Sequence, residues 1–422
     1  MKKLLITLVI PLLLYGCSNE LPQEEINATV SSSSKVITID DAVAIALEQS
    51  KSFPQEVTSR QNTTRTADPK NVIVKKRLSR SGSEPSYYIV NFDNEQGYAV
   101  VPAFNIGEPI IGFVPEGNYS TEGNASLEAY LSMAEEYIAQ QPKLSGDIGP
   151  FEPIPAYNPD TVIVDTNYYY HLDPRVPQEW GQDNIYGQFC PNGVTGCGPL
   201  AMATVTVWTR FKDGDIPTRL YYNYKDCDIP YEDITWSELF KHRWVASSKR
   251  DHLCYTNDPY NVHKSIARLC RQIGHEANTT YHYLPYPYSE SYTDSTETIL
   301  KKYVPSSYTV TSFTSYDYEH VNYYLDHGLL LLLAADSYTN QGHTWIGDGY
   351  HISSISYKII RNYKDPKTMY TERRTDKSCT IHMRWGYDGD GDGYFSGNVF
   401  DLKTSFGSYK YTNPYFIAVY QQ

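Results

Sequence analysis

The pattern of apolar and polar positions predicts a small mixed unit near the start of the chain. Asp40 and Asp41 are candidate helix N-caps, and apolar residues at helical spacing follow them. Two runs of strand-forming residues, Tyr87 to Phe92 and Gly97 to Phe104, flank the turn-like segment DNEQ and predict a hairpin. The segment IIGFVPEG predicts a third strand, and Ser126 to Gln140 an amphipathic helix. Together these elements predict a compact α+β unit.

Polar stretches interrupt this unit and separate it from the rest of the chain. Residues 54 to 84 are rich in Ser, Thr and Arg, so we expect a loop or linker there. The basic cluster from Lys70 to Arg80 is expected to be a connector that is solvated or accessible to processing. After the unit, the proline-rich segment GPFEPIPAYNPDT marks a domain boundary.

Beyond that boundary, predicted helices come first and predicted strands later. Helical periodicity indicates four helices, at Gly198–Phe211, Asn261–Ile273, around Glu297–Tyr303 and at Tyr316–Asp326. Apolar runs indicate four strands, at Leu329–Asp336, His343–Gly347, His351–Tyr357 and Cys379–Trp385. This order is typical of an α+β fold.

The first residues indicate export. Lys2 and Lys3 precede an apolar run from Leu4 to Leu14, which is too short to span a bilayer and is typical of a signal peptide. The sequence LYGC that ends at Cys17 resembles the lipobox of bacterial lipoproteins, which implies cleavage after residue 16 and diacylation of Cys17. We therefore expect an outer-membrane lipoprotein, on the periplasmic side or the cell surface, tethered through residues 17–34. An ordinary signal peptide is the alternative.

Composition excludes several classes of partner and site. The chain has 422 residues and a net charge of -13 without a basic stripe, which argues against a nucleic-acid partner. Six cysteines remain after Cys17, too few for a disulfide framework in a chain of this length. A bond between Cys190 and Cys197 would nevertheless block the second thiol. There is no CxxC or HxxxH spacing, so no structural zinc site is expected.

Cys197 is the main candidate for chemistry. In GVTGCGPLAMATVTVW it stands where a turn of small residues enters a predicted helix. Unpaired N–H groups and the helix dipole stabilise a thiolate there, although a buried structural cysteine is the alternative. His343, in NQGHTWIGDGY, is the candidate base, because it follows Cys197 by roughly the 130–150 residues found in papain-type enzymes. A structural histidine at a strand start is the alternative for His343.

Four segments in the same order resemble streptopain-like cysteine peptidases, which are papain-superfamily enzymes made as zymogens. They are WGQDNIYGQFCP, GVTGCGPLAMATV, QGHTWIGDGY and HMRWGYDGDGDGYF. The unit SYYIVNFDNEQGYAVVPAF with its EAYLSMAEEYI helix looks like the propeptide domain of that family. The resemblance implies an inhibitory α+β propeptide domain at 35–142, a linker with the activation cleavage at 143–165, and a papain-like domain at 166–422.

The resemblance also implies the roles of individual residues. Cys197 corresponds to the nucleophile, His343 to the general base and acid, and Gln182 to the oxyanion-hole amide. Trp385 is expected to pack near the ion pair of thiolate and imidazolium. The implied reaction is the hydrolysis of peptide bonds in proteins or peptides through an acyl-enzyme, with the chain's own propeptide as inhibitor and with no cofactor or metal.

Two departures from the family pattern stand out. Arg384 occupies the place of the family's asparagine, and a guanidinium cannot accept a hydrogen bond from a histidine N–H. Gly198 and Pro199 follow the nucleophile, where the family more often has apolar and small residues, but proline is tolerated in the first helical turn. The run of Asp and Gly from Asp388 to Asp392 superficially suggests calcium, but Val399 stands where an EF-hand loop needs glutamate.

Other functions remain open at this point. The Arg384 change allows a weakened or inactive homologue that acts as a surface binding lipoprotein. A third possibility is a different thiol hydrolase on the same fold, such as an amidase or a transglutaminase.

Overall fold

The computed structural model describes ten stretches of the chain. They are residues 36–53, 64–79, 82–120, 124–141, 161–242, 262–291, 295–336, 342–361, 370–400 and 411–422. All of them belong to one compact unit that spans Ser34–Gln422. The signal peptide, the tether with Cys17, and Cys254 lie outside the described residues. Among the described helices, none has the length and apolar character needed to cross a membrane.

The N-terminal domain, residues 36–141, contains the predicted hairpin and helix. Its helices are α1 (Ile39–Ser50) and α2 (Ala125–Gln140), and its strands are β1 (Val72–Ser79), β2 (Gly82–Asn91), β3 (Tyr98–Pro102) and β4 (Gly112–Val114). The N-cap of α1 is Thr38, so the prediction of Asp40 or Asp41 was wrong. Asp41 is instead the third residue of a capping box, in which its carboxylate accepts from the Thr38 N–H at 2.9 Å.

Strand β1 lies inside the stretch predicted to be a loop. It pairs with β2 from Val72↔Val90 onward, and Val72, Ile73 and Val74 pack against the hydrophobic core. The basic residues that follow masked this strand in the sequence pattern. Lys75 places its ammonium 5.1 Å from the Tyr119 ring centroid, so part of the basic cluster is packed rather than solvated.

The C-terminal domain begins with helices. They are α3 (Asn184–Gly187), α4 (Cys197–Lys212), α5 (Trp236–Lys241), α7 (Val262–Glu276), α8 (Thr296–Tyr303) and α9 (Tyr318–His327). Two short hairpins accompany them, β6 (Thr218–Tyr221) with β7 (Tyr231–Ile234), and β8 (Thr280–His282) with β9 (Tyr288–Glu290). The four helices predicted from periodicity are confirmed as α4, α7, α8 and α9.

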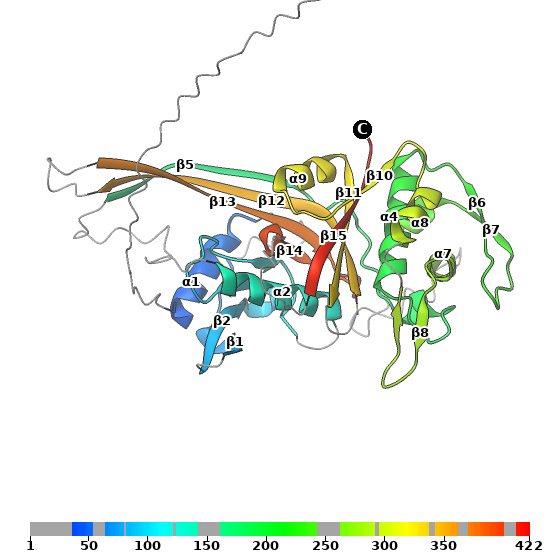
Figure 1. Ribbon diagram of the computed structural model, residues 1–422, viewed down its shortest axis with the longest axis horizontal. Helices are drawn as coiled ribbons and strands as arrows, with labels where there is room; N and C mark the ends of the chain where they lie inside the picture. Colours follow the sequence, from blue (N-terminus) through cyan, green and yellow to red (C-terminus); the bar gives the residue numbers. More distant parts are fainter. Residues whose placement is uncertain are drawn as a thin grey trace, which may run out of the picture. The chain divides into compact units, whose positions relative to one another are not determined.

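The two domains share one sheet of eleven strands in the described chain. The order is β1-β2-β3-β4-β14-β13-β12-β11-β15-β10, with β5 also paired to β12. The further strands are β5 (Thr161–Leu172), β10 (Thr309–Phe313), β11 (Gly328–Asp336), β12 (Gly342–Arg361), β13 (Tyr370–Arg384), β14 (Gly393–Ser396) and β15 (Tyr411–Tyr420). The domains join where β4 pairs with β14, at Phe113↔Tyr394 and Gly112↔Phe395. The long strands β5, β12 and β13 run side by side (Figure 1).

The strands differ from the prediction in three ways. The two short strands predicted at 343–347 and 351–357 are one strand, β12, with a register shift between Gly347 and Gly349. That shift makes Asp348 a bulge residue, which is why the apolar pattern broke there. Strand β5 begins at Thr161, within the stretch 143–165 expected to be linker. Strands β10, β14 and β15 were not predicted.

Candidate active site

Cys197 is the first residue of helix α4, as the sequence predicted. The preceding Gly196 has φ 85°, a backbone conformation that favours glycine. A side chain there would also meet the Ser289 carbonyl oxygen at 3.1 Å. The Thr195 N–H donates to the Gln182 carbonyl oxygen at 2.7 Å, which ties the segment before the thiol to the segment that carries Gln182.

The thiol of Cys197 is enclosed on the side of strand β12. Its Sγ donates to the carbonyl oxygen of Gly342 at 3.9 Å. Burial raises the pKa of Cys197, while hydrogen bonds from the N–H groups of Thr344, Gly198 and Cys197 itself act to lower it. In this form of the protein burial has the larger effect, so the pKa of Cys197 is raised although the thiol stands at a helix N-terminus.

His343 lies on the strand segment that touches this thiol. It is the second residue of β12 and pairs in register with Ala334 of β11. Its two chain neighbours, Gly342 and Thr344, both interact with the Cys197 sulfur. The structure therefore brings the predicted nucleophile and the segment of the predicted base together, although they are far apart in the sequence.

Gln182 and a residue that the sequence analysis missed complete the group. The Gln182 Nε2 is buried and has no hydrogen-bond partner within the described residues. The pKa of Tyr387 is raised by burial and by the nearby charge of Cys197, while the neighbouring Gln182 side chain acts to lower it. Tyr387 thus lies beside both predicted site residues. In the sequence, Tyr387 could have been noticed because it stands two residues after Trp385.

Trp385 lies near Cys197 in an aromatic cluster. It is fully buried, and its ring centroid lies 5.2 Å from that of Trp345 and 5.8 Å from that of Tyr130. Together with Cys197 and Thr344 it lines a cavity of about 20 Å³. The space beside the thiol therefore has room for about one water-sized group in this form of the protein.

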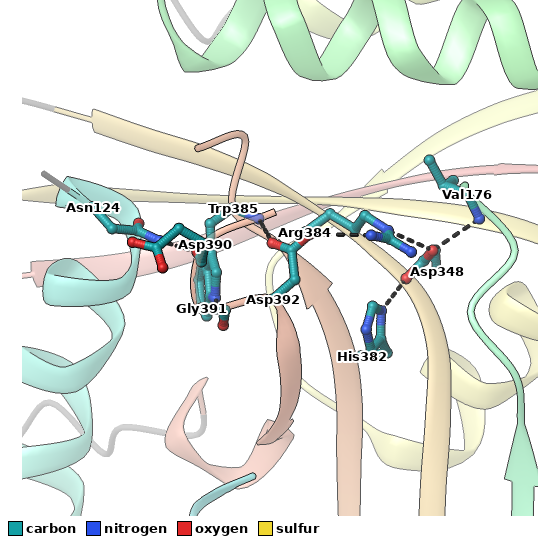
Figure 2. A network of polar contacts seen from close by, with 9 residues as sticks. All are labelled: Asn124, Val176, Asp348, His382, Arg384, Trp385, Asp390, Gly391 and Asp392. Carbon is teal, nitrogen blue, oxygen red and sulfur yellow. Dashed lines mark hydrogen bonds and ion pairs between the residues drawn. The ribbon is translucent and has the colours of Figure 1, made fainter. Parts of the chain in front are cut away.

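The N-terminal domain contacts the same site through the start of α2. The Asn124 side chain caps the helix by accepting from the Leu127 N–H at 2.9 Å, and its Nδ2 donates to the Asp390 carbonyl oxygen at 2.7 Å (Figure 2). Ser126 is fully buried and, with Ala125, acts on the pKa of Tyr387. The first turn of α2 therefore lies against the loop beside Cys197.

A buried ionic network stands where the family's asparagine was expected. Arg384 pairs with two carboxylates, Asp348 and Asp392, and Asp348 also pairs with His382 (Figure 2). Asp348 and His382 were not singled out in the sequence, because their partners are distant along the chain.

Neither a disulfide nor a metal site is seen among the described residues. The thiols of Cys190, Cys197, Cys227, Cys270 and Cys379 are free, so no bond links Cys190 to Cys197. No group of three or more His, Cys, Asp or Glu in the described chain could hold a metal ion. Asp388 is partly buried near Asp183, Asp390 and Glu179, and burial together with these charges raises its pKa to about 7.

Comparison with solved structures supports the fold. The prointerpain A fragment from Prevotella intermedia matches with a TM-score of 0.51 and 17% sequence identity, over 83% of this chain and 99% of the fragment. At this identity the match shows that the two proteins share a fold. A search of curated proteins found no match.

Two family models match the two domains. Residues 34–138 match the Spi protease inhibitor family, and residues 180–395 match the Peptidase C10 family. The second match covers slightly more than half of the chain and contains Gln182, Cys197, His343 and Trp385. The chain therefore belongs to the Peptidase C10 family of streptopain-type cysteine peptidases and carries an inhibitor-like propeptide domain in front of its peptidase domain.

Proposed function

We propose that this cysteine peptidase is an exported, lipid-anchored endopeptidase, made as a zymogen, that cleaves peptide bonds through an acyl-enzyme on Cys197. One observation carries the proposal. Cys197 stands at a helix N-terminus with both neighbours of His343 against its sulfur and the unpaired amide of Gln182 close by. These are the parts that a thiol acyl transfer requires.

The reaction follows from these positions. His343 takes the proton from the Cys197 thiol, and the sulfur attacks the carbonyl carbon of the scissile bond. The Gln182 Nε2 and the Cys197 N–H donate to the oxyanion that develops. The resulting imidazolium gives its proton to the leaving amine. His343 then removes a proton from water, which attacks the thioester and frees Cys197.

The propeptide domain inhibits the enzyme by two kinds of contact. Its sheet continues into the peptidase domain through β4 and β14, and Asn124 at the start of α2 bonds to the loop beside the site. Ala125 and Ser126 in the first turn of α2 also contact Tyr387, which lies beside Cys197. Full activity therefore requires that α2 leaves the loop.

Activation proceeds by cleavage between the two domains. We place the cut before Thr161, because β5 pairs with β12 from Thr161↔Ile360 to Leu172↔Tyr350 and so belongs to the peptidase domain. A version of the chain that begins near residue 161 should be more active than the full-length chain. Equal activity would contradict inhibition by the propeptide.

The lipid anchor rests on the sequence around Cys17, which resembles a lipobox. Diacylation there would hold the enzyme at the outer membrane. Labelling with radioactive palmitate should mark the wild-type chain in a bacterial host that processes lipoproteins. It should not mark a Cys17→Ser variant, and labelling of that variant would refute the anchor.

A matched pair of variants tests the chemistry. Cys197→Ala should reduce casein hydrolysis by the cleaved enzyme by at least about 10³-fold, because the nucleophile is lost. Cys227→Ala, which removes another partly exposed thiol, should keep wild-type activity. Unchanged hydrolysis by Cys197→Ala would refute the proposed mechanism.

A further inference from the structure

Arg384 is held in a fixed position close to the active site. Its side chain is only 11% exposed, its Nε lies 3.3 Å from Asp348 Oδ2, and its Nη1 lies 3.1 Å from Asp392 Oδ2. One guanidinium therefore bridges two carboxylates from different parts of the chain (Figure 2). A planar group with several donors suits this task better than any other side chain.

Asp348 links this bridge to the strand of His343. It is a fully buried bulge residue of β12, five positions after His343. Its Oδ1 accepts from His382 Nδ1 at 2.5 Å, and its Oδ2 accepts from the Val176 N–H at 2.9 Å. Burial acts to raise the pKa of Asp348, but the charges of His382 and Arg384 and these hydrogen bonds lower it overall, so the carboxylate stays ionised.

Asp392 links the other end of the bridge to Trp385. Its Oδ1 accepts from the Trp385 N–H at 2.9 Å, and the Trp385 Nε1 donates to the Gly391 carbonyl oxygen at 2.8 Å. Gly386, Gly389 and Gly391 all have positive φ, so the loop between Trp385 and Asp392 is compact. The position of Trp385 thus depends on Asp392, and that of Asp392 on Arg384.

The network borders the thiol itself. Arg384, Asp392, Trp385 and Thr344 line the same small cavity as Cys197. Arg384 therefore connects the Trp385 side of the cavity with the wall formed by β12, the strand that also carries His343.

Stability alone does not account for such a network. A buried ion pair recovers little more than the cost of removing its charges from water, and apolar side chains of similar size often stabilise a protein as well or better. What the ionic bridge supplies is a defined geometry between two segments.

We propose that Arg384 is a positioning residue, which fixes strand β12 and the Trp385 loop relative to each other so that His343 is held at Cys197. The proposal rests on the proposed roles of Cys197 and His343. It also accounts for an arginine where the family pattern has asparagine, because Arg384 holds the strand instead of accepting from the histidine.

The test compares three variants of the cleaved enzyme on a peptide substrate. Arg384→Gln removes the charge and the bridge, and we expect kcat to fall about 10–100-fold while KM changes little, because small displacements of reacting groups have effects of this size. Arg384→Lys keeps the charge but cannot bridge both carboxylates, so kcat should fall less, about 3–10-fold. The double variant Arg384→Gln, Asp392→Asn removes one unpaired carboxylate, so its urea midpoint should recover while its kcat stays low.

Several outcomes would overturn the proposal. One is a wild-type kcat in Arg384→Gln or, if that variant does not fold, in Arg384→Lys. Another is recovery of kcat together with the urea midpoint in the double variant, which would show a purely structural role. Cys197→Ala is measured alongside. If it is inactive while the Arg384 variants keep wild-type kcat, only this inference fails, and if it is active, the proposed mechanism fails.

Discussion

The half of the peptidase domain that carries Cys197 and the half that carries His343 differ in what fills their cores. The helices around α4 pack on a core made entirely of peptidase-domain residues, between Val176 and Val419. The core on the other side of the sheet combines residues of the propeptide domain, from Ile37 to Ile138, with peptidase residues that include Trp345 and Trp385.

This difference indicates where inhibition acts. Removal of the propeptide leaves the core around the nucleophile complete, but it exposes apolar surface on the half with His343 and the Trp385 loop. The propeptide is therefore placed to control the geometry around His343 and the access to Cys197, while the helix that carries Cys197 stays as it is. Variants in the two cores should separate these effects.

The largest effects are expected from truncations in the two cores. Phe113 of β4 and Leu269 of α7 are both fully buried, so the change to Ala should cost about 3–5 kcal/mol at Phe113 and about 2–5 kcal/mol at Leu269. Phe113→Ala should also raise casein hydrolysis by the uncleaved chain, because it loosens the propeptide domain. Leu269→Ala should lower the urea midpoint without raising casein hydrolysis by the uncleaved chain. An equal rise in hydrolysis in both variants would contradict the comparison.

The next effect concerns pH and the shared core. His351 of β12 bonds through Nε2 to the Ser52 carbonyl oxygen at 2.9 Å and stacks on Phe53, with ring centroids 4.4 Å apart. His171 of β5 and Tyr394 of β14 face it from the peptidase side. Burial, and to a lesser degree the charge of His171, lowers the pKa of His351 to about 4, while the Ser52 carbonyl acts to raise it.

This shift makes the folded chain less stable in acid. Above the ordinary pKa of 6.5 His351 is neutral in both the folded and the unfolded chain, so its contribution to stability is fully present. Between 6.5 and about 4 the proton binds mainly to the unfolded chain, which lowers the free energy of unfolding as the pH falls. The urea midpoint of the full-length chain should therefore fall between pH 7 and 5. It should fall less in His351→Gln, which keeps a donor but does not titrate, and an equal fall in both would contradict this role.

The smallest effect is expected at the start of α2. Asn124→Ala removes both the helix cap and the bond to Asp390, and should weaken propeptide docking by about 1–2 kcal/mol. Asn124→Asp keeps a cap oxygen for the Leu127 N–H but has no donor for the Asp390 carbonyl. Basal hydrolysis by the full-length chain should rise in both variants and more in Asn124→Ala. Wild-type inhibition in Asn124→Asp would show that only the cap matters.

Local patterns were sufficient to predict much of this fold. The helices at α4, α7, α8 and α9 have clear apolar periodicity, and Cys197 could be placed at a helix start because small residues precede it. Strand β1 was missed because its outer half is basic, and the break in β12 was predicted because the bulge at Asp348 interrupts the apolar run. These errors arise where tertiary contacts override the local pattern.

Residues of the candidate site could be predicted from the sequence only where they lie in a recognisable motif. Gln182, Cys197, His343 and Trp385 each lie in a segment that resembles the family, and the fold brings them into one region of the protein. The partners of Arg384 could not be predicted, because Asp348 and Asp392 approach it only through the bulge of β12 and the glycine-rich turn. Tyr387 lies against the first turn of α2, and this too is a tertiary contact that the local sequence does not indicate.

The reactivity of Cys197 in the cleaved and uncleaved protein tests the central claim most directly. We would measure alkylation of each cysteine by iodoacetamide at pH 5.5 by mass spectrometry, with Cys227 as the internal reference. In the cleaved enzyme, Cys197 should react at least about tenfold faster than Cys227, because an imidazolium at His343 stabilises the thiolate, and His343→Ala should abolish the difference. In the full-length chain, where burial raises its pKa, Cys197 should react no faster than Cys227. A Cys197 that reacts equally fast with and without His343 would contradict the account.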